Sequence, residues 1–182
     1  KEVIGEPTET AIVNFALKHG KNKNTLYSTM KRVNEIPFDS TRKMMSTIHK
    51  VGNKYRVITK GAPDVILKRC SYIYNSSSVN SLSYENEISI QKINEKMAND
   101  ALRVIAIGYK DLDYIPQNLE SNSIEKDLIF VGLFGMIDPP RPGVKEAIFT
   151  AKKAGIKTVM ITGDHILTAK SIAKDLGIYT NG

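Results

Sequence analysis

Residues 57–64 (Val-Ile-Thr-Lys-Gly-Ala-Pro-Asp) place a cation, a glycine and a helix-starting proline within a few positions of each other. The apolar start of this stretch suits a strand and Pro63 suits the first turn of a helix, so Lys60 is predicted at a strand end. Gly61 leaves room for a ligand beside the ammonium group, and a helix N-terminus favours negative charge. The stretch therefore predicts an anion site, and the alternative is a plain strand-turn-helix with a solvated lysine.

A second candidate lies near the other end of the sequence, where Thr162-Gly163-Asp164 follows the apolar run 157–161. The run is predicted to be a strand and the residues up to Gly177 a helix, so the tripeptide would form the turn at the carboxyl end of the strand. Folds of the Rossmann type bind ligands at this position. The threonine hydroxyl and two backbone amides would point past the strand end, which predicts a contact with phosphate.

The elements that must position these groups follow from the spacing of apolar residues and from the glycines and prolines between them. The chain should begin with a helix that has Thr8 as its N-cap and Gly20 as its stop. After it we expect, in order, a polar loop over 21–31, an extended segment over 33–38, a hairpin of 45–50 with 55–60 joined at Gly52-Asn53, a helix over 63–69, an exposed loop over 75–81, a helix around 90–101, a strand over 103–107, a loop over 111–127 and a strand over 128–137.

The segment 138–142 is the best domain boundary in the sequence. It contains three prolines, which make a stiff connector. Beyond it the pattern changes to a helix that Gly155 ends, the strand over 157–161 and a second helix. This alternation predicts a partial Rossmann-like α/β segment after the connector.

The composition limits the class of protein. The 182 residues carry a net charge of +7 and one cysteine, Cys70. No apolar run approaches the roughly 20 residues that span a bilayer, and no signal peptide opens the chain, so we expect it to be soluble. The lysines are scattered without an arginine-rich block, which argues against a nucleic acid partner. A single cysteine excludes an internal disulfide and fits a reducing compartment.

Six blocks of this sequence resemble the P-type cation-transporting ATPases, and specifically their type II, calcium-pump-like branch. In the order in which the family has them, the blocks are Gly5-Glu6-Pro7-Thr8-Glu9, Phe38-Asp39-Ser40-Thr41-Arg42-Lys43-Met44-Met45-Ser46, Lys60-Gly61-Ala62-Pro63, Arg103-Val104, Gly135-Met136-Ile137-Asp138-Pro139-Pro140-Arg141 and Met160-Ile161-Thr162-Gly163-Asp164-His165. The resemblance implies an α+β fold in which residues 1–137 form a nucleotide-binding domain, an antiparallel sheet flanked by helices that lacks its first strands. Residues 138–182 would then begin a phosphorylation domain similar to that of the haloacid dehalogenases.

The resemblance also implies roles for single residues, and their chemistry agrees with these roles. An aromatic face stacks on a base, and fixed cations meet a triphosphate. The implied nucleotide-binding residues are a ring that stacks on adenine, two side chains beside the base, a lysine and a glycine at the pocket floor and an arginine at the phosphates, which are Phe38, Glu9, Lys43, Lys60, Gly61 and Arg103. Thr162 and Gly163 would contact the transferred phosphoryl group, and Asp138 and Asp164 would hold ribose or orient the two domains.

The implied function is ATP binding, with Mg²⁺ bound mostly by residues outside this chain. The parent protein would lie in the cell membrane with this domain on the cytoplasmic side, and would couple ATP hydrolysis through an aspartyl-phosphate to cation transport, with calcium as the expected cation. The implied partners are ATP and the phosphorylation, actuator and transmembrane domains of the pump, and we expect the chain itself to be monomeric. The family's Asp-Lys-Thr-Gly-Thr and Gly-Asp-Gly-Val-Asn-Asp blocks do not occur in this sequence. We therefore expect nucleotide binding without phosphoryl transfer, and no metal site.

Two other classes of protein stay open at this point. A free-standing phosphatase of the haloacid dehalogenase type needs an Asp-x-Asp nucleophile motif, which Asp111-Leu112-Asp113 matches in spelling. The preceding strand is expected to end near Ile107, however, whereas the nucleophile should sit directly at a strand tip. A pure interaction module would instead carry its cations as unrelated surface charges. His165 has no second histidine at ligand spacing, so it does not predict a metal site.

Overall fold

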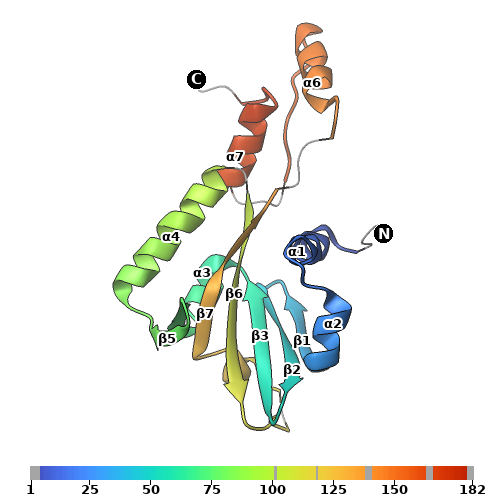
Figure 1. Ribbon diagram of the computed structural model, residues 1–182. Helices are drawn as coiled ribbons and strands as arrows, with labels where there is room; N and C mark the ends of the chain where they lie inside the picture. The colour runs from blue at the N-terminus through green and yellow to red at the C-terminus, as the bar shows by residue number, and fades with distance from the viewer. Residues whose placement is uncertain (1–4, 101, 118, 138–140, 163–165, 180–182) are drawn as a thin grey trace. The chain divides into compact units, whose positions relative to one another are not determined.

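The computed structural model describes residues 5–100, 102–117, 119–137, 141–162 and 166–179 (Figure 1). The chain forms two compact units, residues 1–91 with 105–134 and residues 92–104 with 135–182. The elements are α1 (Pro7–Lys18), α2 (Lys23–Thr29), β1 (Arg32–Asp39), β2 (Met44–Val51), β3 (Lys54–Gly61), α3 (Pro63–Leu67), β4 (Cys70–Asn75), β5 (Ser78–Ser81), α4 (Tyr84–Asn99), β6 (Arg103–Leu112), α5 (Ser121–Ile124), β7 (Leu128–Met136), α6 (Val144–Lys153) and α7 (Ile166–Asp175).

The first unit is organised around a seven-stranded sheet in the order β1-β2-β3-β6-β7-β4-β5. The pairs β1–β2, β2–β3, β3–β6 and β4–β5 are antiparallel. Because β4 pairs parallel with β7, the sheet is mixed rather than purely antiparallel as expected. The α+β class is confirmed.

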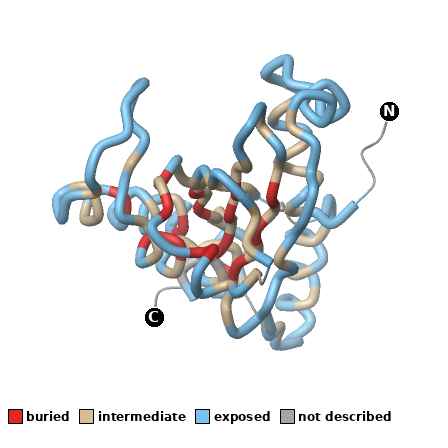
Figure 2. Tube along the Cα trace, turned by 90° about the horizontal axis from the view of Figure 1, so that it is seen from below, coloured by how far each residue is buried: buried red, intermediate tan, exposed pale blue. Residues whose placement is uncertain are grey.

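The β2–β3 hairpin forms as the sequence predicts. Gly52 adopts a φ of +59°, the left-handed conformation that a two-residue hairpin turn requires. Along β2 the residues Met44, Ser46 and Ile48 are buried in alternation, so one face of the hairpin is directed into the core. Figure 2 shows the buried residues gathered along the strands of the sheet.

Two apolar clusters form the core of the first unit. The buried members of the larger cluster are Met44, Ile66, Leu67, Ile90, Ala106 and Phe130. The buried members of the smaller cluster are Ile48, Val57 and Ile124. Between the two clusters, the buried face of the hairpin carries the polar cross-strand pair Ser46 and Thr59.

Helices α1 and α2 lie beside the β1 end of the sheet (Figure 1). Helix α1 begins at Pro7 with Glu6 as its N-cap, so the expected cap at Thr8 is wrong. Proline suits the first helical position because its fixed φ is already helical. Helix α1 packs on the sheet through Phe15, whose ring meets that of Phe134 in β7 edge to face, with 5.1 Å between the centroids. Gly20, with a φ of +71°, follows the helix as expected.

Three further expectations about the first unit are wrong. Residues 23–29 form α2 instead of a loop, because the side chain of Asn22 caps the helix by accepting from the amide of Asn24 at 2.8 Å. The polar tract expected as a loop contains the β4–β5 hairpin turn and strand β5. Strand β6 runs to Leu112, five residues beyond its expected end, because it pairs with β3 from Ala106 to Leu112.

The second unit contains α6 and α7, which confirm the two helices expected beyond the connector. Gly155 and Gly177 follow them with φ values of +76° and +74°. Residues 157–161 are not a strand, although their apolar sequence suits one. A strand needs a neighbour for its backbone groups, and nothing described pairs with this segment. The Rossmann-like alternation therefore stays a prediction. Among the described residues, none of the helices is long and apolar enough to cross a membrane.

Candidate functional site

Three strand ends meet at one edge of the sheet. Asp39 at the end of β1 pairs with Met44 at the start of β2, and Met44 pairs with Gly61 at the end of β3. The register therefore brings Phe38, the turn between β1 and β2, and the end of β3 to the same edge. We call this region the β1–β3 edge. It contains four of the predicted nucleotide-binding residues, namely Phe38, Lys43, Lys60 and Gly61.

Lys60 lies at this edge as predicted and forms an ion pair with Glu9 in the first turn of α1. The side chain of Lys60 is 22% exposed and that of Glu9 is 53% exposed. An ion pair that solvent reaches to this degree contributes about 0–1 kcal/mol to stability. The pair holds the predicted cation and the predicted carboxylate together, and a negatively charged ligand would compete with Glu9 for the ammonium group.

Phe38 presents an open aromatic face, since the residue is 63% exposed. It lies next to the end of β1, where Pro37 precedes it. A large apolar side chain gains little from folding in such a position, so Phe38 is not part of the core. The exposed ring is available for stacking.

The turn between β1 and β2 is tightly defined by hydrogen bonds. The side chain of Asp39 accepts from the amide of Arg42 at 2.7 Å, and its backbone carbonyl accepts from the amide of Lys43 at 2.7 Å. Lys43 itself adopts a φ of +53°, in the left-handed region. The carboxylate of Asp39 thus acts as a local cap for the turn that carries Lys43.

Gly61 is required by packing within the chain. A Cβ atom at this position would lie 2.5 Å from the carbonyl oxygen of Lys43 and 2.6 Å from the Cβ atom of Met44. The backbone of the turn occupies the space that we expected a ligand to use. The groups next to Gly61 are the turn at Lys43 and the start of β2, and the approach of a ligand to this glycine stays a prediction. Its role in binding nucleotide stays a prediction.

The remaining predicted site residues belong to the second unit. Arg103 is exposed and begins β6, and Thr162 is exposed. The predicted positions Asp138, Gly163 and Asp164 lie outside the described residues, and so does His165. The structure therefore gathers the predicted residues of the first unit at the β1–β3 edge and leaves the predicted phosphoryl contacts as expectations.

Sequence reasoning missed three residues that support the edge. Glu125, which is fully buried, accepts from the hydroxyl of Ser46 at 2.7 Å and pairs with Arg42 at 3.3 Å. Arg42 stands next to the predicted Lys43, which is a signal that could have drawn attention to it. Glu125 lies 83 residues away from Arg42, and no local pattern marks it.

Asp111, the candidate nucleophile of the phosphatase alternative, has a structural partner. Arg56 on the neighbouring strand donates to both of its carboxylate oxygens, at 2.7 and 2.8 Å. The hydrogen bond that Arg56 donates to Asp111 raises the pKa of Arg56. Strand β6 extends to Leu112, so the expectation that it ends before the Asp-x-Asp motif is wrong. Asp111 and Arg56 are partners on antiparallel strands, and their bidentate pair fits a cross-strand contact between β6 and β3. Among the described residues, no three His, Cys, Asp or Glu side chains group as metal ligands.

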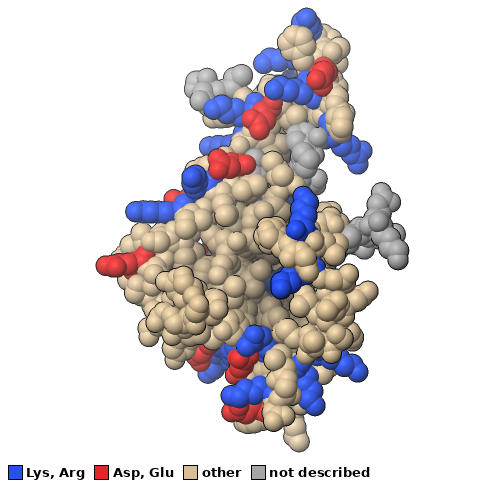
Figure 3. All heavy atoms as spheres, viewed as in Figure 1, with Lys and Arg blue, Asp and Glu red and all other residues tan. Residues whose placement is uncertain are grey.

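Charge and shape add little outside the β1–β3 edge. Lys and Arg side chains crowd α6, while the visible face of the first unit is mostly uncharged above its hairpin ends (Figure 3). A hollow of about 300 Å³ in the second unit lies at the ends of α6 and α7, and its lining includes Ile148, Ile156 and Ile178. It contains none of the predicted site residues. Burial raises the pKa of the Cys70 thiol to about 12, which makes it an inert thiol.

Comparison of the sequence with known proteins identifies the family of this chain. Residues 1–143 match the family described as P-type ATPase, cytoplasmic domain N. The chain is 43% identical over 175 residues to the calcium-transporting ATPase lmo0841 of Listeria monocytogenes, which covers 96% of this chain and 20% of that protein. It is 46% identical over 173 residues to a calcium-transporting ATPase of Bacillus subtilis, with 94% of this chain and 19% of the relative covered.

The similarity extends to plants. A plasma membrane-type calcium-transporting ATPase 4 of Arabidopsis thaliana is 40% identical over 183 residues, which cover all of this chain and 18% of the relative. The chain thus spans about a fifth of the length of the relatives it matches. A family match over most of the chain, together with this level of identity, shows that the chain belongs to the P-type ATPases and resembles their calcium-transporting members.

Proposed function

We propose that this chain binds ATP at the β1–β3 edge. The observation that carries the proposal is the meeting of an exposed ring, Phe38, with the cations Lys43 and Lys60 at three adjoining strand ends. A purine needs a flat apolar face, and the phosphates of a nucleotide need fixed positive charge. The region offers both within one unit of the chain.

Each residue at the edge has a defined part in this proposal. Phe38 stacks on adenine, and Lys43 lies beside the base on the adjoining turn. Lys60 reaches the nucleotide from the end of β3, at the floor of the site next to Gly61. Glu9 holds Lys60 in place while the site is empty and would accept from the exocyclic amine of the base. Arg103, Asp138, Thr162, Gly163 and Asp164 are proposed contacts for the phosphates and ribose, as the family resemblance implies.

The residues present fit a nucleotide better than a separate metal ion. No cluster of metal ligands occurs in the part of the chain that the structure describes. Mg²⁺ would therefore arrive with the triphosphate, which it coordinates through phosphate oxygens and water. When bound, it neutralises part of the phosphate charge. This chain contributes binding and orientation of the nucleotide.

The whole protein is proposed to be a pump that uses ATP to move a cation across a membrane through an aspartyl-phosphate. The support is that the relatives are called calcium-transporting ATPases and align along nearly the whole chain. We propose calcium as the cation, and the phosphorylation, actuator and transmembrane domains as the partners of this chain. Residues 1–137 would belong to the nucleotide-binding domain and residues 138–182 to the phosphorylation domain. Uptake of ⁴⁵Ca²⁺ into vesicles that carry the full-length parent tests this part, and uptake that excess Mn²⁺ abolishes would point to another cation.

The binding proposal is tested by titrating ATP into the chain and into Phe38→Ala by calorimetry. Loss of a base–aromatic stack costs about 1–3 kcal/mol, so the affinity should fall roughly 5- to 150-fold. Tyr114→Ala is the matched control, because Tyr114 is another exposed aromatic residue of the same unit, at 73% against 63% for Phe38. Unchanged affinity in Phe38→Ala, or an equal loss in Tyr114→Ala, would contradict the adenine platform. A wild-type chain that binds no ATP would favour an interaction module.

A further inference from the structure

We propose that Glu125 is a positioning residue for the nucleotide site: it fixes the turn between β1 and β2 through Arg42, and thereby places Phe38 and Lys43. This inference rests on the proposed ATP binding for its functional meaning. Its structural part concerns only how the turn is held. Glu125 follows α5, far along the chain from every residue of the β1–β3 edge.

Arg42 connects the two sides of the turn. One of its guanidinium nitrogens, Nη2, donates to the carbonyl of Pro37 at 2.7 Å and to the carbonyl of Met44 at 3.2 Å. Pro37 directly precedes Phe38, and Met44 directly follows Lys43. A single planar group therefore ties together the backbone on both sides of the two residues that would contact the base.

Glu125 orients that guanidinium from the other side. Its Oε2 atom accepts from Nη1 of Arg42 at 3.3 Å and from the hydroxyl of Ser121 at 2.8 Å. Its Oε1 atom accepts from the hydroxyl of Ser46 at 2.7 Å. Because Ser46 has one proton and donates it to the carboxylate, it must accept from Thr59, which lies 2.8 Å away. The carboxylate thus collects donors from β2, α5 and the turn.

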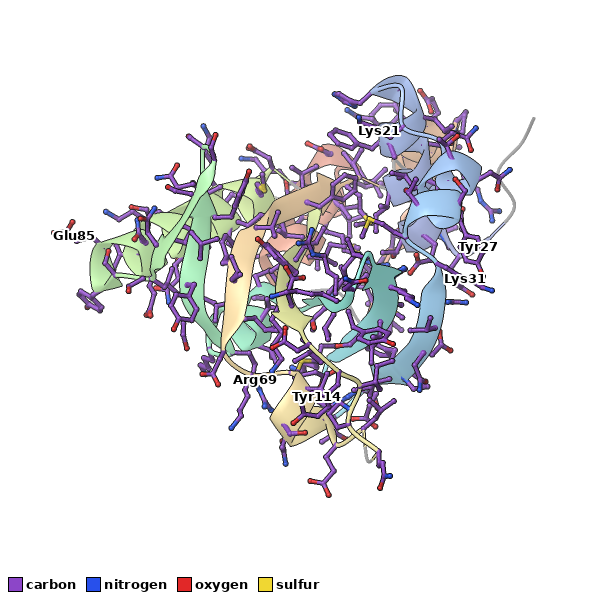
Figure 4. The ribbon with its side chains drawn as sticks, turned by 60° about the horizontal axis from the view of Figure 1, so that its bottom comes forward. Lys21, Tyr27, Lys31, Arg69, Glu85 and Tyr114 are labelled. Carbon is purple, nitrogen blue, oxygen red and sulfur yellow. The ribbon has the colours of Figure 1, made fainter. Side chains whose placement is uncertain are left out.

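The position of Glu125 is itself fixed by the surrounding elements. Lys110 of β6 donates to the backbone carbonyls of Ser123 and Lys126 at 3.0 and 3.1 Å, on either side of Glu125. Figure 4 draws Arg69 close to the start of β7, and its guanidinium donates to the backbone carbonyl of Glu125 at 3.4 Å. The carboxylate therefore has little freedom to follow Arg42 if the turn moves.

The stability of the core alone does not explain a charge at this position. Glu125 is completely buried at the polar pair between two apolar clusters. Removing a carboxylate from water is costly, and a buried ion pair often stabilises a fold less than apolar residues of the same volume. An apolar side chain could fill the gap between the clusters, but it could not hold Arg42 against the two carbonyls. The polar pair Ser46 and Thr59 is thus explained by the carboxylate that it supports, which orients Arg42.

The test is Glu125→Gln in the full 182-residue chain. Glutamine keeps the volume and one acceptor oxygen, but its amide nitrogen cannot accept, and the side chain loses the charge that orients Arg42. ATP affinity should fall about tenfold, because small displacements of positioned groups are costly in binding. Hydrogen exchange supplies a readout without ligand: the amide of Lys43 should lose about tenfold in protection, while amides of β3 keep theirs.

The matched control is Ser121→Ala. It removes one hydrogen bond to the same carboxylate oxygen but leaves the pair with Arg42 intact. We expect this variant to melt at a lower temperature while ATP affinity and the protection of Lys43 stay at the wild-type values. If both variants lose affinity in proportion to their loss of stability, Glu125 has only a structural role and the proposal is overturned. Wild-type affinity and protection in Glu125→Gln would overturn it as well.

Failure of ATP binding can be told apart from failure of this inference. If the wild-type chain binds no ATP, the proposed function fails, while the exchange rate of the Lys43 amide still decides whether Glu125 holds the turn. If Glu125→Gln does not fold, Arg42→Lys takes its place, since lysine keeps the charge but has one nitrogen in place of the two that reach Glu125 and the carbonyls. Loss of protection at Lys43 in that variant supports the inference, and unchanged protection contradicts it.

Discussion

Two carboxylates pair with cations close to the β1–β3 edge, in opposite surroundings. Glu9 is 53% exposed and meets Lys60 from a neighbouring helix. Glu125 is completely buried, and its partner Arg42 is 16% exposed. Solvent can replace the first pair at little cost, whereas loss of one partner of the second pair leaves an unpaired charge in the core. The first pair is thus suited to exchange its partner for a ligand, and the second to hold the frame in which that exchange occurs.

Arg42→Ala should lower the free energy of unfolding most, because it breaks the buried pair with Glu125. Removing one partner of a buried pair costs about 3–5 kcal/mol, and we expect about 3 kcal/mol here because Ser46 and Ser121 still donate to Glu125. Urea unfolding followed by circular dichroism measures the change. A loss below about 1 kcal/mol would place this pair in the same class as the exposed one.

Gly61→Ala should disturb the edge through packing alone. The added Cβ atom would lie 2.5 Å from the carbonyl oxygen of Lys43. Overpacking of this kind costs about 1–3 kcal/mol, and we expect about 2 kcal/mol. Gly132→Ala is the control, because a Cβ atom there would meet nothing within 4 Å. Equal unfolding free energies for the two variants would show that the turn yields, and the edge would then be less rigid than the buried pair implies.

Glu9→Gln should change the free energy of unfolding by less than about 1 kcal/mol, since the pair with Lys60 is exposed to solvent. In the same variant, labelling with an amine-reactive reagent measures whether ATP covers Lys60. ATP should protect Lys60 and leave the exposed Lys153 reactive. If ATP changes the labelling of Lys60 no more than that of Lys153, Lys60 is not part of the site.

The smallest expected effect is on catalysis. The sequence contains no Asp-Lys-Thr-Gly-Thr block, so incubation with radiolabelled ATP should leave no acid-stable phosphate on the chain. This expectation holds for the wild type and for every variant above, because none of their residues is a phosphate acceptor. Labelled phosphate on Asp111 would reverse the reading of its pair with Arg56 and return the phosphatase alternative.

The success of prediction from sequence depended on how local the determining contacts are. The β2–β3 hairpin was predictable because Gly52 and the alternating residues around it specify both turn and faces. The edge that carries Phe38 and Lys60 followed from this hairpin. Gly61 was predicted for the wrong reason, since the group that approaches it belongs to a turn 18 positions earlier in the chain, at Lys43.

Contacts between distant parts of the chain account for what the sequence did not reveal. Glu125 has no local signal, because its role is defined by Arg42 in the turn and Ser46 in β2, which lie 83 and 79 residues away in the sequence. Residues 157–161 show the converse. Their apolar sequence favours a strand, but a strand forms only where a neighbour supplies hydrogen bonds, and the described residues supply none to this segment.

The left-handed backbone of Lys43, with a φ of +53°, sets a trade-off between the stability of the fold and the binding of nucleotide. A non-glycine residue in this conformation costs about 1 kcal/mol or more, and glycine would relieve it. A search for heat-resistant variants in the absence of nucleotide would therefore select Lys43→Gly. The same substitution would remove a cation from the proposed site. At position 43, selection for thermal stability and selection for ATP binding would therefore favour different amino acids.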